Sequence, residues 1–187
     1  APTIEATPLN DVVGDCAVID LMDVAPNEAI GAERVSARFA HVRPSDLVLF
    51  KTGWDRQRDF RNKEFWLDAP YLTREAALFL KDQGVRTVAF DFPQDYCIRL
   101  LLSGEVRPIE EHVTHDILLR AGVHMIEYVV NTAGISAPRV FLSAAPLNIG
   151  MDKSGQLTTG SAGSGDVGRG HEHTGMTAEG ARQGLDA

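Results

Sequence analysis

The sequence lacks long apolar runs and has few basic residues. No apolar stretch approaches the roughly 20 residues that a membrane-spanning helix requires, and the start shows no basic-then-apolar signal pattern. Lys and Arg number 18 against 26 Asp and Glu, which gives a formal net charge of −8. Such a charge disfavours phosphate backbones and acidic membrane surfaces. We therefore expect neither nucleic acid nor a membrane as a partner, and a cytoplasmic location.

Cysteine is also scarce, since Cys16 and Cys97 are the only two in the chain. They form no CxxC motif, and each lies in or beside an apolar run. This arrangement disfavours a zinc ribbon or a redox pair and favours two buried core thiols.

The remaining composition is that of a folded globular protein. Hydrophobic residues make up 44% and charged residues 24% of 187 positions, which suits one domain of ordinary size. We place that domain at residues 1–151. From 152 to 187, Gly, Ser and Thr dominate and apolar periodicity is lost, which predicts a flexible tail. The tail's His171-Glu172-His173 is a weak metal-binding tract at most.

Apolar runs, together with Gly, Pro and capping residues that end elements, predict an alternation of strands and helices. Thr73 is a plausible N-cap for a helix that ends at Gly84. A second helix is expected from Pro108 to Gly122, and a long surface loop over 54–70. Buried strands are expected at residues 12–21, 47–52, 85–91, 123–130 and 139–144. Strand, helix and strand in this order indicate a sheet-based α/β domain.

Three residues in the second half could bind a metal. His112 and His115 are three positions apart on the predicted helix, so they project from nearly the same face. By spacing alone, such a pair is more often two ordinary histidines. Glu127 lies in the apolar segment VHMIEYVV, where a carboxylate needs a partner or a cation. The alternative for Glu127 is a strand-edge carboxylate that faces water or Arg120.

The order of motifs resembles the cyclase family of metal-dependent hydrolases, which includes bacterial kynurenine formamidase and isatin hydrolase. The matching stretches are TIEATPL, VVGDCAVIDL, DLVLFKTGWDR, YLTREAALFLKDQGVRTVAFD, HDILLRAGVHMIEYVVN and FLSAAPLNI. The resemblance implies a swivelling β/β/α-type single domain, built on a mixed sheet with flanking helices. It also implies that His115 and Glu127 are metal ligands.

One part of the family pattern is missing from this sequence. Family members carry a motif of the form HxGTHxDxP, which supplies two histidines and an aspartate to the metal, shortly before the segment that matches Thr3-Ile4-Glu5. The chain starts at Ala1 without that motif, and His41 is the only histidine among its first 60 residues. We expect the chain to begin partway through a longer protein, with the domain incomplete at its N-terminus. Two ligands alone should bind metal poorly, because a catalytic zinc site usually has three.

Aromatic residues in and beside the predicted loop are candidates for substrate contact. Trp54, Trp66 and Tyr71 could form a wall for a planar substrate, and the alternative is that they pack the loop onto the domain. Asp91 ends a predicted strand, where α/β folds often place functional groups, although a loop-capping role is the more common one.

These observations lead to two hypotheses for function. The first is a hydrolase that uses zinc or manganese to activate water against a small cyclic or N-acyl amide or a lactone, as in a kynurenine formamidase or an isatin hydrolase. The second is a non-catalytic relative that binds a ligand or a partner. In either case we expect a small-molecule ligand and a homo-oligomer, with a homodimer as the simplest form.

Overall fold

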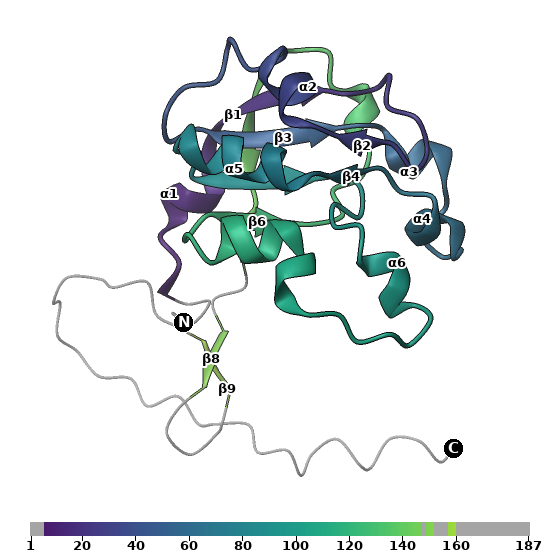
Figure 1. Ribbon diagram of the computed structural model, residues 1–187. Coiled ribbons are helices and arrows are strands. Elements are labelled where there is room, and N and C mark those ends of the chain that lie inside the picture. Colours follow the sequence, from purple (N-terminus) through teal and green to yellow (C-terminus); the bar gives the residue numbers. More distant parts are fainter. Residues whose placement is uncertain (1–5, 147–148, 152–156, 160–187) are drawn as a thin grey trace, which may run out of the picture. The chain divides into compact units, whose positions relative to one another are not determined.

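The computed structural model describes residues 6–146, 149–151 and 157–159 (Figure 1). The chain divides into two compact units, Ala1–Leu147 and Asn148–Ala187. In the second unit, strands β8 (Ile149–Met151) and β9 (Leu157–Thr159) pair antiparallel. The sequence predicted neither strand. The rest of the predicted tail, including His171-Glu172-His173, lies outside the described residues.

A five-stranded mixed sheet forms the centre of the first unit. Its order is β6-β5-β3-β1-β7. The four strands from β6 to β1 run parallel, and β7 pairs antiparallel with β1. The strands are β1 (Val13–Asp20), β3 (Leu47–Lys51), β5 (Thr87–Phe90), β6 (His124–Ile126) and β7 (Arg139–Ser143). The predicted α/β class and mixed sheet are thus confirmed.

Short helices and a small second sheet surround this centre. The α-helices are α1 (Leu9–Val12), α2 (Ala32–Ser36), α3 (Trp54–Gln57), α4 (Glu64–Leu67), α5 (Arg74–Asp82) and α6 (Ile98–Leu101). Turns of 3-10 helix are η2 (Ile109–Glu111) and η4 (Thr132–Gly134), and η3 (His115–Leu119) is a π-helical turn. Strands β2 (Ala29–Ile30) and β4 (Tyr71–Leu72) pair parallel.

The helix α5 follows the sequence prediction closely. Thr73 caps it, and its side-chain oxygen accepts a hydrogen bond of 3.3 Å from the backbone N–H of Ala76. The apolar residues Ala76, Ala77 and Leu80 are all buried. Because α5 connects the parallel strands β3 and β5, it lies against the sheet, with α2 beside it (Figure 1).

The two faces of the sheet have separate apolar clusters, as the alternation of side chains along a strand requires. In β3, Val48 and Phe50 point to the face that α2 and α5 cover, and this cluster is the larger one. Leu47 and Leu49 point to the other face. There the cluster is small, and it is completed by partly buried residues: Ile126, Val129, Ile135, Val140 and Leu142.

Three sequence predictions of secondary structure were wrong in extent. The segment 54–70 contains α3 and α4 instead of one long loop. The expected helix after Pro108 is interrupted at His112, with η2 before it and η3 after it. The predicted strand 123–130 is limited to β6, because the chain turns sharply at Tyr128, whose φ is 60°. Glu127 therefore follows the strand and does not lie within it.

Cys16 and Cys97 are free and buried, as predicted. Burial raises the pKa of the Cys16 thiol to about 12 and that of Cys97 to about 11, so both remain protonated and weakly nucleophilic at neutral pH. Across the described ranges, no helix is long and apolar enough to cross a membrane.

Candidate metal centre

The carboxyl ends of β5 and β6 bring the predicted metal ligands together. These strands are parallel neighbours, with Ala89 paired to Ile126, so the residues that follow them emerge at the same edge of the sheet. Glu127 follows β6 directly, and His115 begins η3, which packs beside β6. The distance from His115 Nε2 to Glu127 Oε1 is 4.0 Å. The two side chains therefore lie close enough to approach one metal ion.

His115 lies in an unusual helical turn. The backbone N–H of Arg120 donates to the carbonyl of His115 at 3.2 Å, which is the five-residue spacing of a π-helix. Such turns are rare and occur often at functional sites, because they change the direction in which a side chain points. The sequence predicted an ordinary α-helix here, with His112 and His115 on nearly one face. The two rings do lie close together, with centroids 6.0 Å apart, although His112 precedes the π-helical turn.

Asp95 orients the imidazole of His115. Its Oδ2 lies 2.8 Å from His115 Nδ1, and its Oδ1 accepts a 2.8 Å hydrogen bond from the backbone N–H of Thr114. Asp95 is only 2% exposed. The hydrogen bond from the imidazole to Asp95 raises the pKa of His115 above its ordinary value. With Nδ1 committed to Asp95, Nε2 is the ring atom that faces Glu127.

Gln94 contacts the other candidate ligand. Its Nε2 donates to Glu127 Oε1 at 2.5 Å and lies 3.4 Å from Thr114 Oγ1. The side chain of Gln94 is fully buried, and its Oε1 has no partner among the described residues. A buried amide in this arrangement can hold a carboxylate in a single orientation.

The donor set fits a divalent metal ion. Ligand bonds from His nitrogen and carboxylate oxygen to zinc are about 2.0–2.2 Å long, so atoms 4.0 Å apart can both reach one ion. Ligand atoms of Asp95, His112 and His115 also lie within 4.8 Å of one another. Both oxygens of Asp95 are already in hydrogen bonds, however. His115 Nε2 and Glu127 Oε1 thus form the candidate donor pair, and Asp95 lies behind His115.

The structure has a cavity of about 680 Å³. Tyr128, which directly follows Glu127, forms part of its wall with Trp66, and their ring centroids are 5.2 Å apart in an edge-to-face arrangement. Burial raises the pKa of Tyr128 to about 12, so its phenol is neutral. Arg56, Arg58 and Arg61 are among the other lining residues. His115 and Glu127 do not line the cavity itself.

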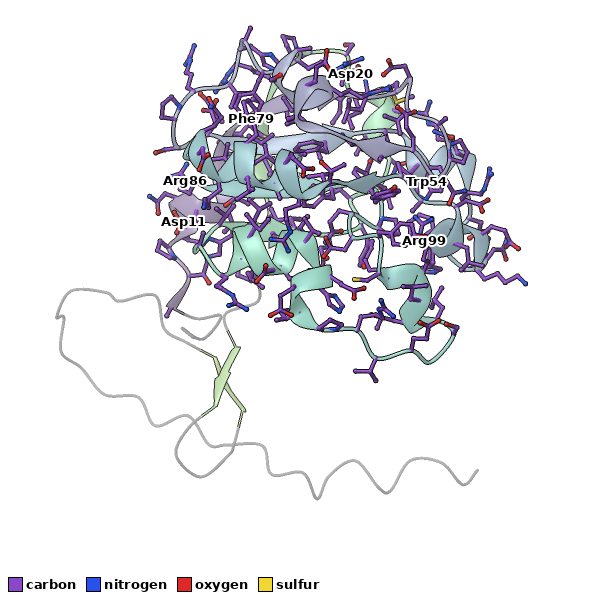
Figure 2. The ribbon with its side chains drawn as sticks, in the orientation of Figure 1. Asp11, Asp20, Trp54, Phe79, Arg86 and Arg99 are labelled. Carbon is purple, nitrogen blue, oxygen red and sulfur yellow. The ribbon has the colours of Figure 1, made fainter. Side chains whose placement is uncertain are left out.

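The three predicted aromatic residues occupy different positions. Trp66 lines the cavity, whereas Trp54 is fully buried and donates from Nε1 to the carbonyl of Phe65 at 2.8 Å. Tyr71 contacts Tyr96 instead, with ring centroids 4.9 Å apart. Figure 2 shows Trp54 and Arg99 at the end of the domain where α3, α4 and α6 gather. Of the three, Trp66 alone borders the cavity.

Asp91 lines the cavity and anchors the loops around it through hydrogen bonds. Its carboxylate accepts hydrogen bonds from the backbone N–H groups of Thr52 and Gly53, and from the hydroxyls of Thr52 and Thr132. Burial raises the pKa of Asp91, and these four donors oppose the rise. The capping role that the sequence favoured for Asp91 agrees with these contacts.

Sequence reasoning missed Gln94, Asp95 and Tyr128. One signal pointed to the first two, since polar residues directly after a buried parallel strand commonly line the carboxyl edge of a sheet. The same signal indicates Asp91, and Gln94 and Asp95 lie three and four residues beyond it. For Tyr128 the sequence carried no comparable signal, because it lies in an apolar run and no local pattern predicts the turn there.

Comparison with known proteins agrees with this fold. The Cyclase family model matches residues 1–94, so the chain belongs to the Cyclase family. A solved structure described as "Potential Metal-Dependent Hydrolase With Cyclase Activity" is 33% identical. It has a TM-score of 0.59, over 79% of this chain and 63% of that one. A "predicted metal-dependent hydrolase" from Bacillus stearothermophilus is 30% identical, with a TM-score of 0.53 over 72% and 56%.

More distant structures share the fold. Isatin hydrolase A from Labrenzia aggregata, bound to benzyl benzoate, is 18% identical, with a TM-score of 0.63 over 84% of this chain and 62% of that one. No curated protein matched. The chain thus spans about three fifths of the length of the solved structures it resembles.

Proposed function

We propose that this chain contributes His115 and Glu127 to the metal site of a hydrolase that opens a small cyclic or N-acyl amide or a lactone. The observation that carries the proposal is the 4.0 Å separation of His115 Nε2 and Glu127 Oε1, with Nδ1 of His115 held by Asp95. The description of the 33%-identical relative as a metal-dependent hydrolase supports the same reaction class.

In this proposal the residues of the chain bind the metal ion and orient its ligands. His115 and Glu127 would hold the ion, and zinc or manganese suits a ligand set of imidazole and carboxylate. When bound, such an ion supplies Lewis acidity, which makes a coordinated water more acidic and polarises the carbonyl that the water attacks. Two ligands are fewer than the three usual in a catalytic zinc site. The family's HxGTHxDxP segment would supply the others.

The cavity suggests the kind of substrate. A volume of about 680 Å³ is within the range of sites for small molecules. Trp66 and Tyr128 offer aromatic edges and faces to a planar ring, and exposed Arg56 lies at the same cavity. We therefore propose an aromatic amide or imide, for which N-formylkynurenine and isatin are suitable probes.

The test compares the 187-residue chain with a version extended upstream through an HxGTHxDxP segment. Both are assayed with N-formylkynurenine and isatin after chelation, and again after zinc or manganese is added. We expect metal-dependent turnover by the extended version, loss of that turnover in His115→Ala and Glu127→Gln, and little turnover by the 187-residue chain. Equal and chelator-resistant turnover by both versions would reject the proposal. Metal binding without turnover by either would favour the non-catalytic alternative.

A further inference from the structure

Two consecutive residues, Gln94 and Asp95, each contact a different member of the proposed ligand pair. Gln94 Nε2 lies 2.5 Å from Glu127 Oε1, and Asp95 Oδ2 lies 2.8 Å from His115 Nδ1. Both residues are at least 98% buried, so neither contact is in competition with bulk water.

The backbone that carries these two residues is itself held in place. The backbone N–H of Leu72 donates to the carbonyl of Gln94 at 2.9 Å. A few residues upstream, the carboxylate of Asp91 anchors the end of β5 to the loop at Thr52 and Gly53. The dipeptide is therefore a fixed support and not a mobile loop tip.

Thr114 contacts both Gln94 and Asp95. Its backbone N–H donates to Asp95 Oδ1 at 2.8 Å, and its hydroxyl oxygen lies 3.4 Å from Gln94 Nε2. Since Thr114 directly precedes His115, the same contacts fix the start of η3. Asp95 thus accepts the backbone N–H of Thr114 at Oδ1 and contacts the His115 imidazole at Oδ2.

We propose that Gln94 and Asp95 are positioning residues for the metal ligands: Asp95 keeps the proton of neutral His115 on Nδ1 and leaves the Nε2 lone pair facing Glu127, while Gln94 fixes the Glu127 carboxylate. The proposal rests on the function proposed above. Hydrogen-bonding partners of this kind set the tautomer and orientation of a ligating histidine, and their loss commonly lowers metal affinity by about 10- to 100-fold.

The substitution Asp95→Asn separates positioning from simple support of the fold. The amide oxygen of Asn would face the N–H of Thr114, so its NH₂ group would face His115 Nδ1. Neutral His115 would then have to accept at Nδ1 and carry its proton on Nε2. If Asp95 only supported the fold, Asp95→Asn would leave the His115 proton on the same ring nitrogen.

Long-range ¹H–¹⁵N NMR spectra of the 187-residue chain, with ¹⁵N-labelled histidine, measure this directly. His115→Gln assigns the resonances, and the spectra are recorded above the pKa of the imidazole. We expect the Nδ1–H tautomer in the wild type and the Nε2–H tautomer in Asp95→Asn. Asp46→Asn is the matched control, because Asp46 is also a buried carboxylate that accepts from a backbone N–H, and it has no contact with His115 in the described hydrogen bonds. It should leave the His115 tautomer unchanged.

Zinc titration of the same samples gives the second measurement. His115 signals report binding at this site separately from any binding by other histidines. We expect the zinc affinity at His115 to fall about 10- to 100-fold in Asp95→Asn. Gln94→Met, which removes the donor from Glu127 at similar volume, should weaken zinc binding while the Nδ1–H tautomer persists. If Asp95→Asn is poorly folded, Gln94→Met still tests the support of Glu127.

The outcomes distinguish the two proposals. If zinc perturbs His115 in the wild type, but Asp95→Asn keeps both the tautomer and the affinity, the positioning role is overturned and the metal site stands. The Nε2–H tautomer in the wild type would overturn it as well. If zinc leaves His115 unchanged in the 187-residue chain and in the upstream-extended version, the proposed function fails, and the positioning proposal fails with it.

Discussion

Asp91 shows how much of this domain depends on a single buried carboxylate. It joins the end of β5 to the loop after β3 and to Thr132 at the start of η4. The four donors come from Thr52, Gly53 and Thr132, and all of them need an acceptor at this position.

The substitution Asp91→Asn should therefore lower the free energy of unfolding by about 2–4 kcal/mol. Asn provides one acceptor oxygen, and its NH₂ group must face at least one of the existing donors. Urea denaturation followed by circular dichroism measures the change. Asp59→Asn, at a more exposed ion pair with Arg61, is the comparison and should have little effect. Equal stability of the two variants would contradict the capping role.

The cavity also makes a residue-level prediction. Trp66→Ala should weaken the binding of isatin about tenfold, because it removes one aromatic wall and its edge-to-face contact with Tyr128. Tyr71→Ala is the matched control, since Tyr71 is aromatic but does not line the cavity. NMR titration with isatin gives both dissociation constants. Similar affinities for the two variants would show that this cavity is not the binding site.

At the same scale, the sequence singled out the candidate ligand pair and gave only a weak signal for the residues that contact it. His115 and Glu127 stood out, one within a family motif and the other as a charge in an apolar segment. Gln94 and Asp95 follow a strand as ordinary polar residues. Their contacts depend on the path of a loop and on the π-helical turn at His115, and neither is encoded in a local pattern.

Among the elements, strands were predicted better than helices. Apolar runs such as 47–52 are clear because both faces of a central strand are buried, whereas the helical segment after Pro108 has no continuous apolar stripe. The short helices α3 and α4 are fixed by tertiary contacts, such as the hydrogen bond from Trp54 to Phe65. Such contacts override local propensity and are not visible in the sequence.

The junction between β3 and α3 has a specific requirement for glycine. Gly53 has a φ of 64°, and a Cβ atom there would lie 2.8 Å from Met22 Sδ and 3.3 Å from Ala133 Cβ. Gly84, after α5, has a φ of 68° but no atom within 4 Å of such a Cβ. The two positions share the same backbone conformation and differ in crowding.

Gly84→Ala should cost about 1–2 kcal/mol of stability, from the left-handed conformation alone. Gly53→Ala should cost about 1–3 kcal/mol more, because Met22 must also move. Urea unfolding of both variants measures the difference, and Met22→Ala in the Gly53→Ala background should recover part of it. If Gly53→Ala is no worse than Gly84→Ala, the crowding at this junction is not significant.

Across the whole first unit, one ion pair connects the sheet edge to its interior. Arg139, at the start of β7, makes two hydrogen bonds to Asp46, of 2.7 and 3.0 Å, just before β3. The Arg139 guanidinium lowers the pKa of the Asp46 carboxyl below its ordinary value.

This pair should contribute to the dependence of stability on pH. A carboxyl group whose pKa is lower in the folded state stabilises the protein above its unfolded pKa, near 3.9, and that contribution is lost as pH falls through the folded pKa. Asp46→Asn should therefore be less stable than the wild type by about 1–3 kcal/mol near pH 7. The difference should shrink as the pH is lowered below about 4. Urea unfolding across this range tests it, and a constant difference would show that the charge of Asp46 is not responsible.

The antiparallel pairing of β1 with β7 has a consequence for biosynthesis. It joins Val13 to Ser143, so nearly the whole first unit must leave the ribosome before β1 gains its second neighbour. Until then β1 presents an unpaired row of backbone groups, the kind of strand that can add to another chain. Pairings so distant along the chain also form slowly, because a long loop must be closed first. During translation, the nascent chain is therefore most prone to aggregation in the interval that ends when β7 emerges.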